Sequence, residues 1–310
     1  GTAQYGARFR GGCAAGGARH GQFLEWLDRV ASFLDSVVDG VSGESVPIVF
    51  RPFHEHTGDW FWWCTGSPAQ PTDTTPEQFV ALWRMTVDYL RDSCGLHNVL
   101  YAYSPDRSRI DMSSESTCEA GYLYAYPGDE YVDVLGFDDY WDIAPADVEA
   151  ERPRERHDDL ITMLTVVGRL ARERGKIAAA TEVGSPGEFA SRYVMSAEDE
   201  AALAGAGACA SAADDGCAAH GESNRCRSGT AQTAAPSESD SPWTRYLLTA
   251  ALANSDTRRV LWYMPWRNDP GAAGTGAYGT PVEGSRYAAD FRRFTKHPFI
   301  RMANTLPPLY

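Results

Sequence analysis

The chain has 310 residues, 43% of them hydrophobic, so it is long enough to bury a sizeable core as one large α/β domain or two small ones. Its formal net charge of −14 argues against a nucleic-acid partner, because binding a polyanion requires basic surfaces. No stretch reaches the ~18 unbroken apolar residues of a membrane span, and no secretory signal is visible at Gly1.

Helices are expected throughout the chain after the Gly- and Ala-rich residues 1–21. The first follows from apolar residues at helical spacing between Phe23 and Val37. The second runs from Pro76 to about Asp92, with Thr75 as its N-cap and Gln78 completing a capping box. Further helices are expected at about 154–174, ended by Gly175, from Ser241 onward, and at about 285–296.

Five apolar runs are typical of strands, at 47–53, 98–105, 131–141, 176–184 and 259–268. Their alternation with helices predicts βαβ units and a parallel sheet, and near-continuous apolar runs are typical of strands covered on both faces. No glycine-rich phosphate loop follows any strand, which favours a barrel over a doubly wound nucleotide-binding sheet. The doubly wound sheet stays open as the alternative.

Residues 197–240 form a low-complexity segment rich in Ala, Ser and Gly, which we expect to be a surface insertion. An active-site lid is the functional alternative. The segment holds Cys217, His220 and Cys226, but no clean fourth ligand, so a local disulfide or free thiols are expected there before a zinc site. The seven cysteines are irregularly spaced, and no disulfide framework can be read from them.

Polar and aromatic residues follow each strand at its C-terminal end, where parallel barrels carry their active sites. Glu55 and Glu182 stand out, because carboxylates in apolar settings are rarely buried without a partner. One interpretation is structural, for example an ion pair of Glu182 with Arg51. The other is chemical, since two carboxylates facing one cleft are what cleavage of a glycosidic bond requires.

The neighbouring residues suit two different roles for the carboxylates. The aromatic run at 60–63 after Glu55 predicts an apolar wall that would keep this carboxyl group protonated as an acid. Arg51, His54 and Tyr140 could donate to an ionised nucleophile. Indoles offer flat surfaces to sugar rings, so Trp60, Trp63 and Trp266 are candidate platforms, with core packing as the alternative for each. Trp26 and Trp83, on helices, are expected in the core.

Four motifs, "FRPFHEHTGDWFWW", "GFDDYW", "TEVG" and "WYMPWRN", together resemble glycoside hydrolase family 26, chiefly β-mannanases, over roughly residues 20–190 and 240–300. The resemblance implies a retaining (β/α)8 TIM barrel with its acid/base after strand 4 and its nucleophile after strand 7. By motif match, Glu55 is the acid/base and Glu182 the nucleophile. His54 and Trp60 match residues that line the sugar subsite at the cleavage point, and Tyr140 matches the tyrosine that hydrogen-bonds the nucleophile. Trp266 matches the stacking platform, and Arg267 matches the arginine that reaches the next sugar.

The function implied by this resemblance is a retaining endo-β-1,4-mannanase that acts on a mannan-type polysaccharide. The family includes enzymes for mixed-linkage β-glucan and β-1,3-xylan, which remain alternatives together with a non-catalytic carbohydrate-binding protein. We expect no metal and no organic cofactor, a monomer, and no membrane or nucleic-acid partner. Secretion is implied by the family and by the size of the substrate.

The strand count predicts a partial barrel within one catalytic domain over 1–310. Glu55 ends the first visible strand and Glu182 the fourth, the same separation as between strands 4 and 7 of the family. The visible strands therefore correspond to strands 4–8, and strands 1–3 are expected to be missing, because residues 1–21 contain no apolar run. Exposed edges at 47–53 and 259–265 should leave the chain alone poorly soluble and weakly active or inactive.

Overall fold

The computed structural model describes residues 17–140, 142, 153–184, 243–266 and 288–306. The low-complexity segment at 197–240, with Cys217, His220 and Cys226, lies outside the described residues, as does Arg267. The cysteines within the described part, Cys64, Cys94 and Cys118, are free thiols.

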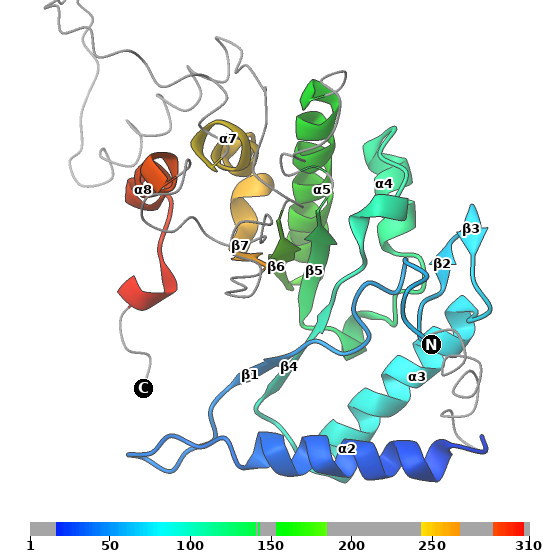
Figure 1. Cartoon of the computed structure of the whole chain (residues 1–310). Coiled ribbons are helices and arrows are strands. Elements are labelled where there is room, and N and C mark those ends of the chain that lie inside the picture. The colour runs from blue at the N-terminus through cyan, green and yellow to red at the C-terminus, as the bar shows by residue number, and fades with distance from the viewer. Residues whose placement is uncertain (1–16, 141, 143–152, 185–242, 267–287, 307–310) are drawn as a thin grey trace, which may run out of the picture.

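A single five-stranded parallel sheet forms the centre of the described structure. Its strands follow one another in the order of the chain, namely β1 (Ile48–Phe50), β4 (Val99–Tyr103), β5 (Val134–Asp139), β6 (Ile177–Val183) and β7 (Val260–Pro265). A doubly wound sheet would reverse this order at a switch point, and no reversal occurs here. The sheet is a curled half-barrel (Figure 1), so the predicted partial (β/α) barrel is confirmed.

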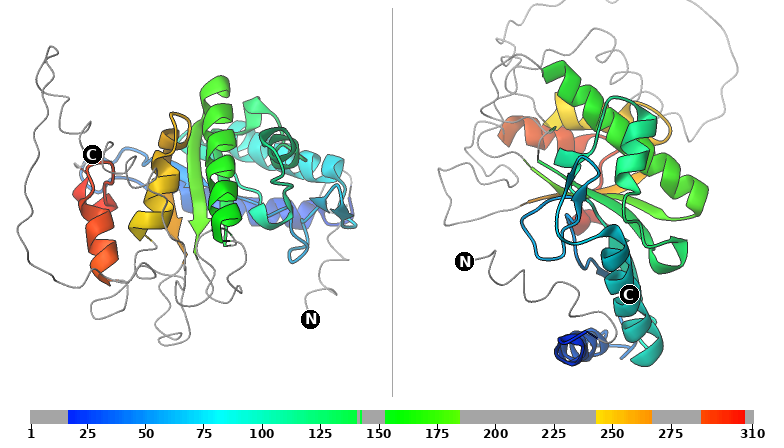
Figure 2. Two further views of the ribbon diagram at one scale, coloured as in Figure 1. Left: turned by 90° about the horizontal axis from the view of Figure 1, so that it is seen from above. Right: turned by 90° about the vertical axis from the view of Figure 1, so that its right-hand side faces the viewer.

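Helices connect the strands and cover the sheet. They are α2 (His20–Asp35), α3 (Pro76–Asp88), α4 (Glu115–Tyr122), α5 (Pro153–Arg174), α7 (Thr249–Leu252) and α8 (Ala288–Lys296). α5 packs against β5 and β6 and runs alongside the sheet in the left view of Figure 2. None of the helices in the described part of the chain is both long and apolar enough to cross a bilayer.

The N-cap of α3 and the glycine after α5 that the sequence predicted are both present in the structure. The Thr75 hydroxyl accepts from the backbone N–H of Gln78, and the Gln78 side chain accepts from the backbone N–H of Thr75. α3 continues into a short π-helical turn, η1 (Tyr89–Ser93). Gly175 follows α5 with a φ of 65°, the left-handed conformation that favours glycine at a helix end.

Two elements were not expected from the sequence. α4 has only eight residues and buries two of them, Cys118 and Tyr122, so its apolar pattern is weak. The hairpin of β2 (Gly66–Ser67) and β3 (Gln70–Pro71) contains only two residues in each strand. The hairpin lies in the connection after β1, and α4 lies in the connection after β4.

The two helical tryptophans differ in burial. Trp83 is 1% exposed and donates from its ring N–H to the backbone oxygen of Tyr131, as expected for a core residue. The same expectation is wrong for Trp26, which is 37% exposed. The buried face of α2 is formed by Phe23, Leu27, Ala31 and Leu34, and Trp26 projects beside this face.

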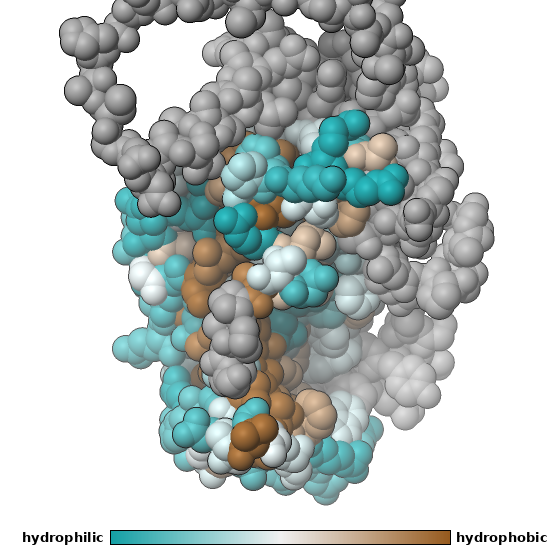
Figure 3. Space-filling model, turned by 90° about the vertical axis from the view of Figure 1, so that its left-hand side faces the viewer, coloured by the Kyte–Doolittle hydropathy of each residue, from teal (hydrophilic) through white to brown (hydrophobic). Residues whose placement is uncertain are grey.

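Within the described residues, the outer strands β1 and β7 each have a neighbouring strand on one side only. Large apolar residues on these strands are exposed, with Val49 at 46% and Leu261 at 68%. Figure 3 shows hydrophobic residues gathered in a band down the face that forms the left-hand side of Figure 1. The expected exposed apolar edges are therefore present.

Candidate active site

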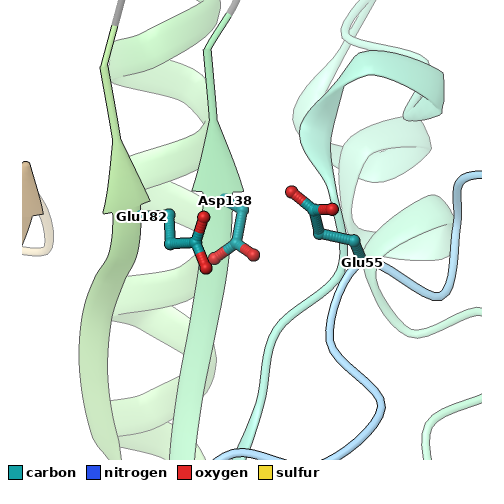
Figure 4. A group of neighbouring side chains, drawn as sticks. All are labelled: Glu55, Asp138 and Glu182. Atoms are coloured by element: carbon teal, nitrogen blue, oxygen red, sulfur yellow. The ribbon is translucent and has the colours of Figure 1, made fainter. Parts of the chain in front are cut away.

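Three carboxylates converge at the C-terminal ends of the strands. Asp138 is the second-last residue of β5 and Glu182 the second-last residue of β6, while Glu55 faces them from the loop after β1 (Figure 4). One oxygen of each lies within 4.8 Å of one oxygen of each of the others. The two glutamates predicted from the sequence thus face one another. Asp138, which lies in the motif "GFDDYW", was not singled out as a site residue.

The backbone holds Glu55 in an unusual conformation. Its φ is 54°, and Phe53 two residues earlier has a φ of 50°, a region that side-chain-bearing residues seldom adopt. The Glu55 N–H donates to the backbone oxygen of Ser104, while its own carbonyl accepts from Gly58 N–H at 2.9 Å and the Cys64 thiol at 3.3 Å. Backbone strain of this kind persists where the surrounding structure enforces it, which is common at functional sites.

Glu55 has the electrostatic surroundings of a proton donor. Burial is the largest influence and raises the pKa of its carboxyl group to about 7. The indole N–H of Trp60 donates to Oε2 of Glu55 at 2.6 Å and lowers the pKa, and Arg51 lowers it further, whereas Asp106 and Glu182 raise it. Near neutral pH, a substantial share of Glu55 therefore carries a proton.

Glu182 is buried and accepts hydrogen bonds at both oxygens. Arg51 donates to Oε1, and the hydroxyl of Tyr140 donates to Oε2 at 2.5 Å. The ion pair with Arg51, which the sequence suggested as a structural interpretation, therefore exists. It does not exclude the chemical interpretation, because a charged donor and a phenol are the partners that an ionised nucleophile requires.

Arg51 also binds Asp138, with 2.7 Å between Nη1 and Oδ2. Asp138 is fully buried, and its Oδ1 accepts from Thr181 Oγ1 at 2.7 Å. Burial raises the pKa of Asp138, and Arg51 counters it. The spacing of the three carboxylates would permit a metal ion, but Arg51 already supplies positive charge to two of them. That the chemistry needs no metal stays a prediction.

The predicted aromatic residues divide into exposed and packed side chains. Trp60 and Trp266 are 42% and 39% exposed, and the backbone N–H of Trp266 donates to the backbone oxygen of Val183 at 2.9 Å, directly after β7. Trp63 stacks on Phe61 with ring centroids 4.5 Å apart and is half-buried. The first two indoles therefore offer free surface, whereas Trp63 is mainly a packing residue.

His54 lies within the same aromatic group. Its ring centroid is 4.9 Å from Phe61 and 6.0 Å from Trp63, and the ring N–H of Trp63 donates to the backbone oxygen of His54 at 2.8 Å. Burial lowers the pKa of His54, and Arg51 lowers it further, which favours the neutral imidazole. A neutral His54 can still donate one hydrogen bond to a sugar hydroxyl.

Comparison with known proteins gives a consistent set of relatives. The family model of glycosyl hydrolase family 26 matches residues 15–199. A mannan endo-1,4-beta-mannosidase of Bifidobacterium adolescentis is 38% identical over 173 residues, which make up 56% of this chain and 16% of that protein.

Two solved structures resemble the described fold. One is GH26C from Muricauda sp. MAR_2010_75, with a TM-score of 0.64 and 29% identity, covering 96% of this chain and 60% of that one. The other is a GH26 beta-mannanase from Bacteroides ovatus, with a TM-score of 0.63 and 29% identity, covering 97% of this chain and 66% of that one. The chain thus spans a sixth of the Bifidobacterium protein and about two thirds or less of these structures.

Proposed function

The chain belongs to glycosyl hydrolase family 26, and we propose that it hydrolyses the β-1,4 bonds of mannan-type polysaccharides, cutting within the chain and retaining the anomeric configuration. The observation that carries the proposal is the pair formed by Glu55 and Glu182. One has a pKa raised to about 7, and the other is bound by a guanidinium and a phenol. Mannan as the substrate is supported by the relatives, which are named mannan endo-1,4-beta-mannosidases.

In the proposed mechanism, the Glu182 carboxylate attacks the anomeric carbon while Glu55 protonates the departing glycosidic oxygen. The resulting glycosyl ester on Glu182 is then hydrolysed by a water molecule that Glu55, now ionised, deprotonates. The spacing supports this course, because retaining enzymes hold the two carboxyl groups about 5–5.5 Å apart and inverting enzymes ~6.5–9.5 Å apart. The nearest oxygens of Glu55 and Glu182 lie within 4.8 Å.

The substrate is proposed to lie along the strand ends, between the two exposed indoles. Trp60 and Trp266 would stack on sugar rings, and His54 would donate to a hydroxyl beside the cleaved bond, while Tyr140 keeps its hydrogen bond to Glu182. Arg267 is proposed, from its motif, to reach the next sugar. Since such a polymer cannot cross a membrane, we propose that the protein acts outside the cell, as a monomer with one catalytic domain and without a cofactor.

A panel of soluble polysaccharides tests the substrate. We expect reducing ends to be released from galactomannan and glucomannan, and not from mixed-linkage β-glucan or β-1,3-xylan, with the β-anomer appearing first by proton NMR. Preferential release from the glucan or the xylan would replace the substrate, and binding without release would favour a carbohydrate-binding role.

The activity should fall as the pH rises through about 7. Glu55 must carry a proton to act as the acid, and the site raises its pKa to about 7, so each unit of pH above that value should lower kcat/KM about tenfold. The measurement is kcat/KM on galactomannan between pH 5 and 9. A basic limb near pH 4–5, where an ordinary glutamate titrates, would contradict the assignment.

A further inference from the structure

Trp60 makes a specific contact although much of it is exposed. Its indole N–H donates to Glu55 at 2.6 Å, while 42% of the residue remains open to solvent. A tryptophan with this much exposure has several rotamers within reach unless neighbouring groups hold its ring. The hydrogen bond to Glu55 therefore depends on what packs against the indole.

Arg109 is one of the groups that packs against this ring. Its guanidinium carbon lies 5.9 Å from the centroid of a Trp60 ring, within the range of a cation–π contact. The same guanidinium is paired with Asp59, with 2.7 Å between Nη2 and Oδ2. The guanidinium of Arg109 therefore contacts both the indole of Trp60 and the carboxylate of Asp59.

The segment that carries Arg109 is fixed to the loop that carries Glu55. Arg109 ends the short helix η2 (Arg107–Arg109) after β4, and the Asp106 side chain caps this helix at the N–H of Ser108. The Thr57 hydroxyl, on the Glu55 loop, donates to the backbone oxygen of Asp106 at 2.7 Å, and both residues are buried. The η2 segment that carries Arg109 is therefore hydrogen-bonded to the loop that carries Trp60.

Gly58 is the other group that defines the position of the ring. A Cβ atom at Gly58 would lie 2.5 Å from Cη2 and Cζ2 of Trp60, far inside van der Waals contact. Gly58 is not among the residues with positive φ, so its backbone conformation would accept a side chain. The three atoms nearest to such a Cβ all belong to the indole of Trp60, so the ring occupies the space that a side chain at Gly58 would need.

We propose that Arg109, oriented by Asp59, is a positioning residue that holds the Trp60 indole N–H on the Glu55 carboxylate, and that Gly58 leaves the space this requires. The proposal rests on the proposed function only for the role of Glu55 as acid/base, since the contact itself can be measured without turnover. A hydrogen bond to the ionised carboxylate opposes the effect of burial. Arg109 would thereby help to set the pH at which Glu55 loses its proton.

Several other groups act on Glu55 and must remain unchanged in a test. They are Asp106 after β4, Glu182 on β6, Asp138 on β5, Tyr140 after β5, Arg51 after β1 and the thiol of Cys64. Gly58→Ala, which changes no charge, and Arg109→Lys, which keeps the cation, separate an effect transmitted through Trp60 from a direct effect of the Arg109 charge on Glu55.

The test uses the full chain labelled with 5-fluorotryptophan and fluorine NMR. The Trp60 resonance is identified by its absence in Trp60→Phe, and its chemical shift is followed from pH 4 to 9. In the unchanged chain, the resonance should titrate near pH 7 with Glu55, and in Glu55→Gln it should not titrate there. The readout requires no substrate, so it can succeed or fail independently of mannan hydrolysis.

In Arg109→Met and in Gly58→Ala, the midpoint should rise by about 0.5–1 pH unit, since one hydrogen bond to the ionised form is weakened. The Trp60 resonance should also move toward the position of a solvent-exposed indole. Arg109→Lys keeps a cation but not the planar guanidinium. Its titration midpoint should therefore lie between those of these variants and that of the unchanged chain.

A matched control is available elsewhere in the fold. Arg174 is paired with Asp129 at 2.9 Å and lies 5.4 Å from the ring centroid of Tyr126, the same combination of contacts without Trp60. Arg174→Met should leave the Trp60 midpoint unchanged. If Arg109→Met and Gly58→Ala both keep the midpoint and the Trp60 shift of the unchanged chain, or if Arg109→Met behaves as Arg174→Met does, the proposal is wrong.

Discussion

Replacing Glu182 by Ala is expected to remove activity toward every substrate, whereas replacing Glu55 by Ala should spare substrates whose leaving group needs no proton. Without Glu182 no glycosyl ester forms, and loss of a covalent nucleophile lowers kcat by about 10⁴-fold or more. Loss of Glu55 removes only proton transfer, worth ~10²–10⁴-fold on a polysaccharide. With a dinitrophenyl β-mannobioside, formation of the ester in Glu55→Ala should proceed at close to the unchanged rate.

The second step separates the two variants further. Hydrolysis of the ester needs Glu55 as a base, so Glu55→Ala should release a burst of dinitrophenol and then slow down, and added azide should restore turnover. Glu77→Ala, which removes an exposed carboxylate at the start of α3, is the control and should change neither step. If the two glutamate variants respond alike to the activated substrate, the assignment of roles is wrong.

The positions of the two glutamates could be predicted, because Glu182 lies near the end of an apolar strand, Glu55 follows another, and the ends of parallel strands meet at one face. The conformation of Glu55 could not, since its φ of 54° depends on hydrogen bonds to Ser104 and Gly58 that only the folded chain forms. Asp138 could not be predicted as a site residue for a similar reason. A carboxylate next to Asp139 in one motif has no visible partner until β1 brings Arg51 beside it.

The regular elements were predictable where their apolar pattern was long. All five strands and the capping box of α3 were expected, but α4 was not, since an eight-residue helix that buries two side chains has almost no period. Trp26 shows the opposite error, because its place on a helix suggested burial although it lies beside the buried face of α2. The contact of Arg109 with Trp60 joins two segments that follow different strands, so no local sequence pattern could predict it.

Replacing Arg51 by Met is expected to cause a large loss of stability at pH 7. Arg51 donates to Asp138, Glu182 and Ser104, and both carboxylates are buried. A methionine fills similar volume but leaves two buried carboxylates without a cation, which costs about 3–5 kcal/mol. That is a large part of the ~5–15 kcal/mol that stabilises a typical domain. Arg51→Lys keeps the positive charge but loses the planar guanidinium that binds both carboxylates, so its stability should lie between those of Arg51→Met and the unchanged chain.

The pH dependence distinguishes lost charge pairing from lost packing. Burial already raises the pKa of Asp138 above its unfolded value, and Arg51 opposes this, so Arg51→Met should raise it further. Between the unfolded and the folded pKa, the folded state binds more protons, so its stability increases as the pH falls through that window. The deficit of Arg51→Met relative to the unchanged chain should therefore shrink as the pH falls from the folded pKa of Asp138 in the variant to its folded pKa in the unchanged chain.

Urea unfolding in steps of one pH unit from pH 5 to pH 9 measures this deficit. The control is Arg172→Met, which removes an exposed pair with Asp256 and should change stability little at any of these pH values. A deficit for Arg51→Met that stays the same over the whole pH range would mean that packing, and not charge, is what Arg51 contributes. A deficit that shrinks as the pH falls would mean that Arg51 contributes through its charge, by opposing the effect of burial on Asp138.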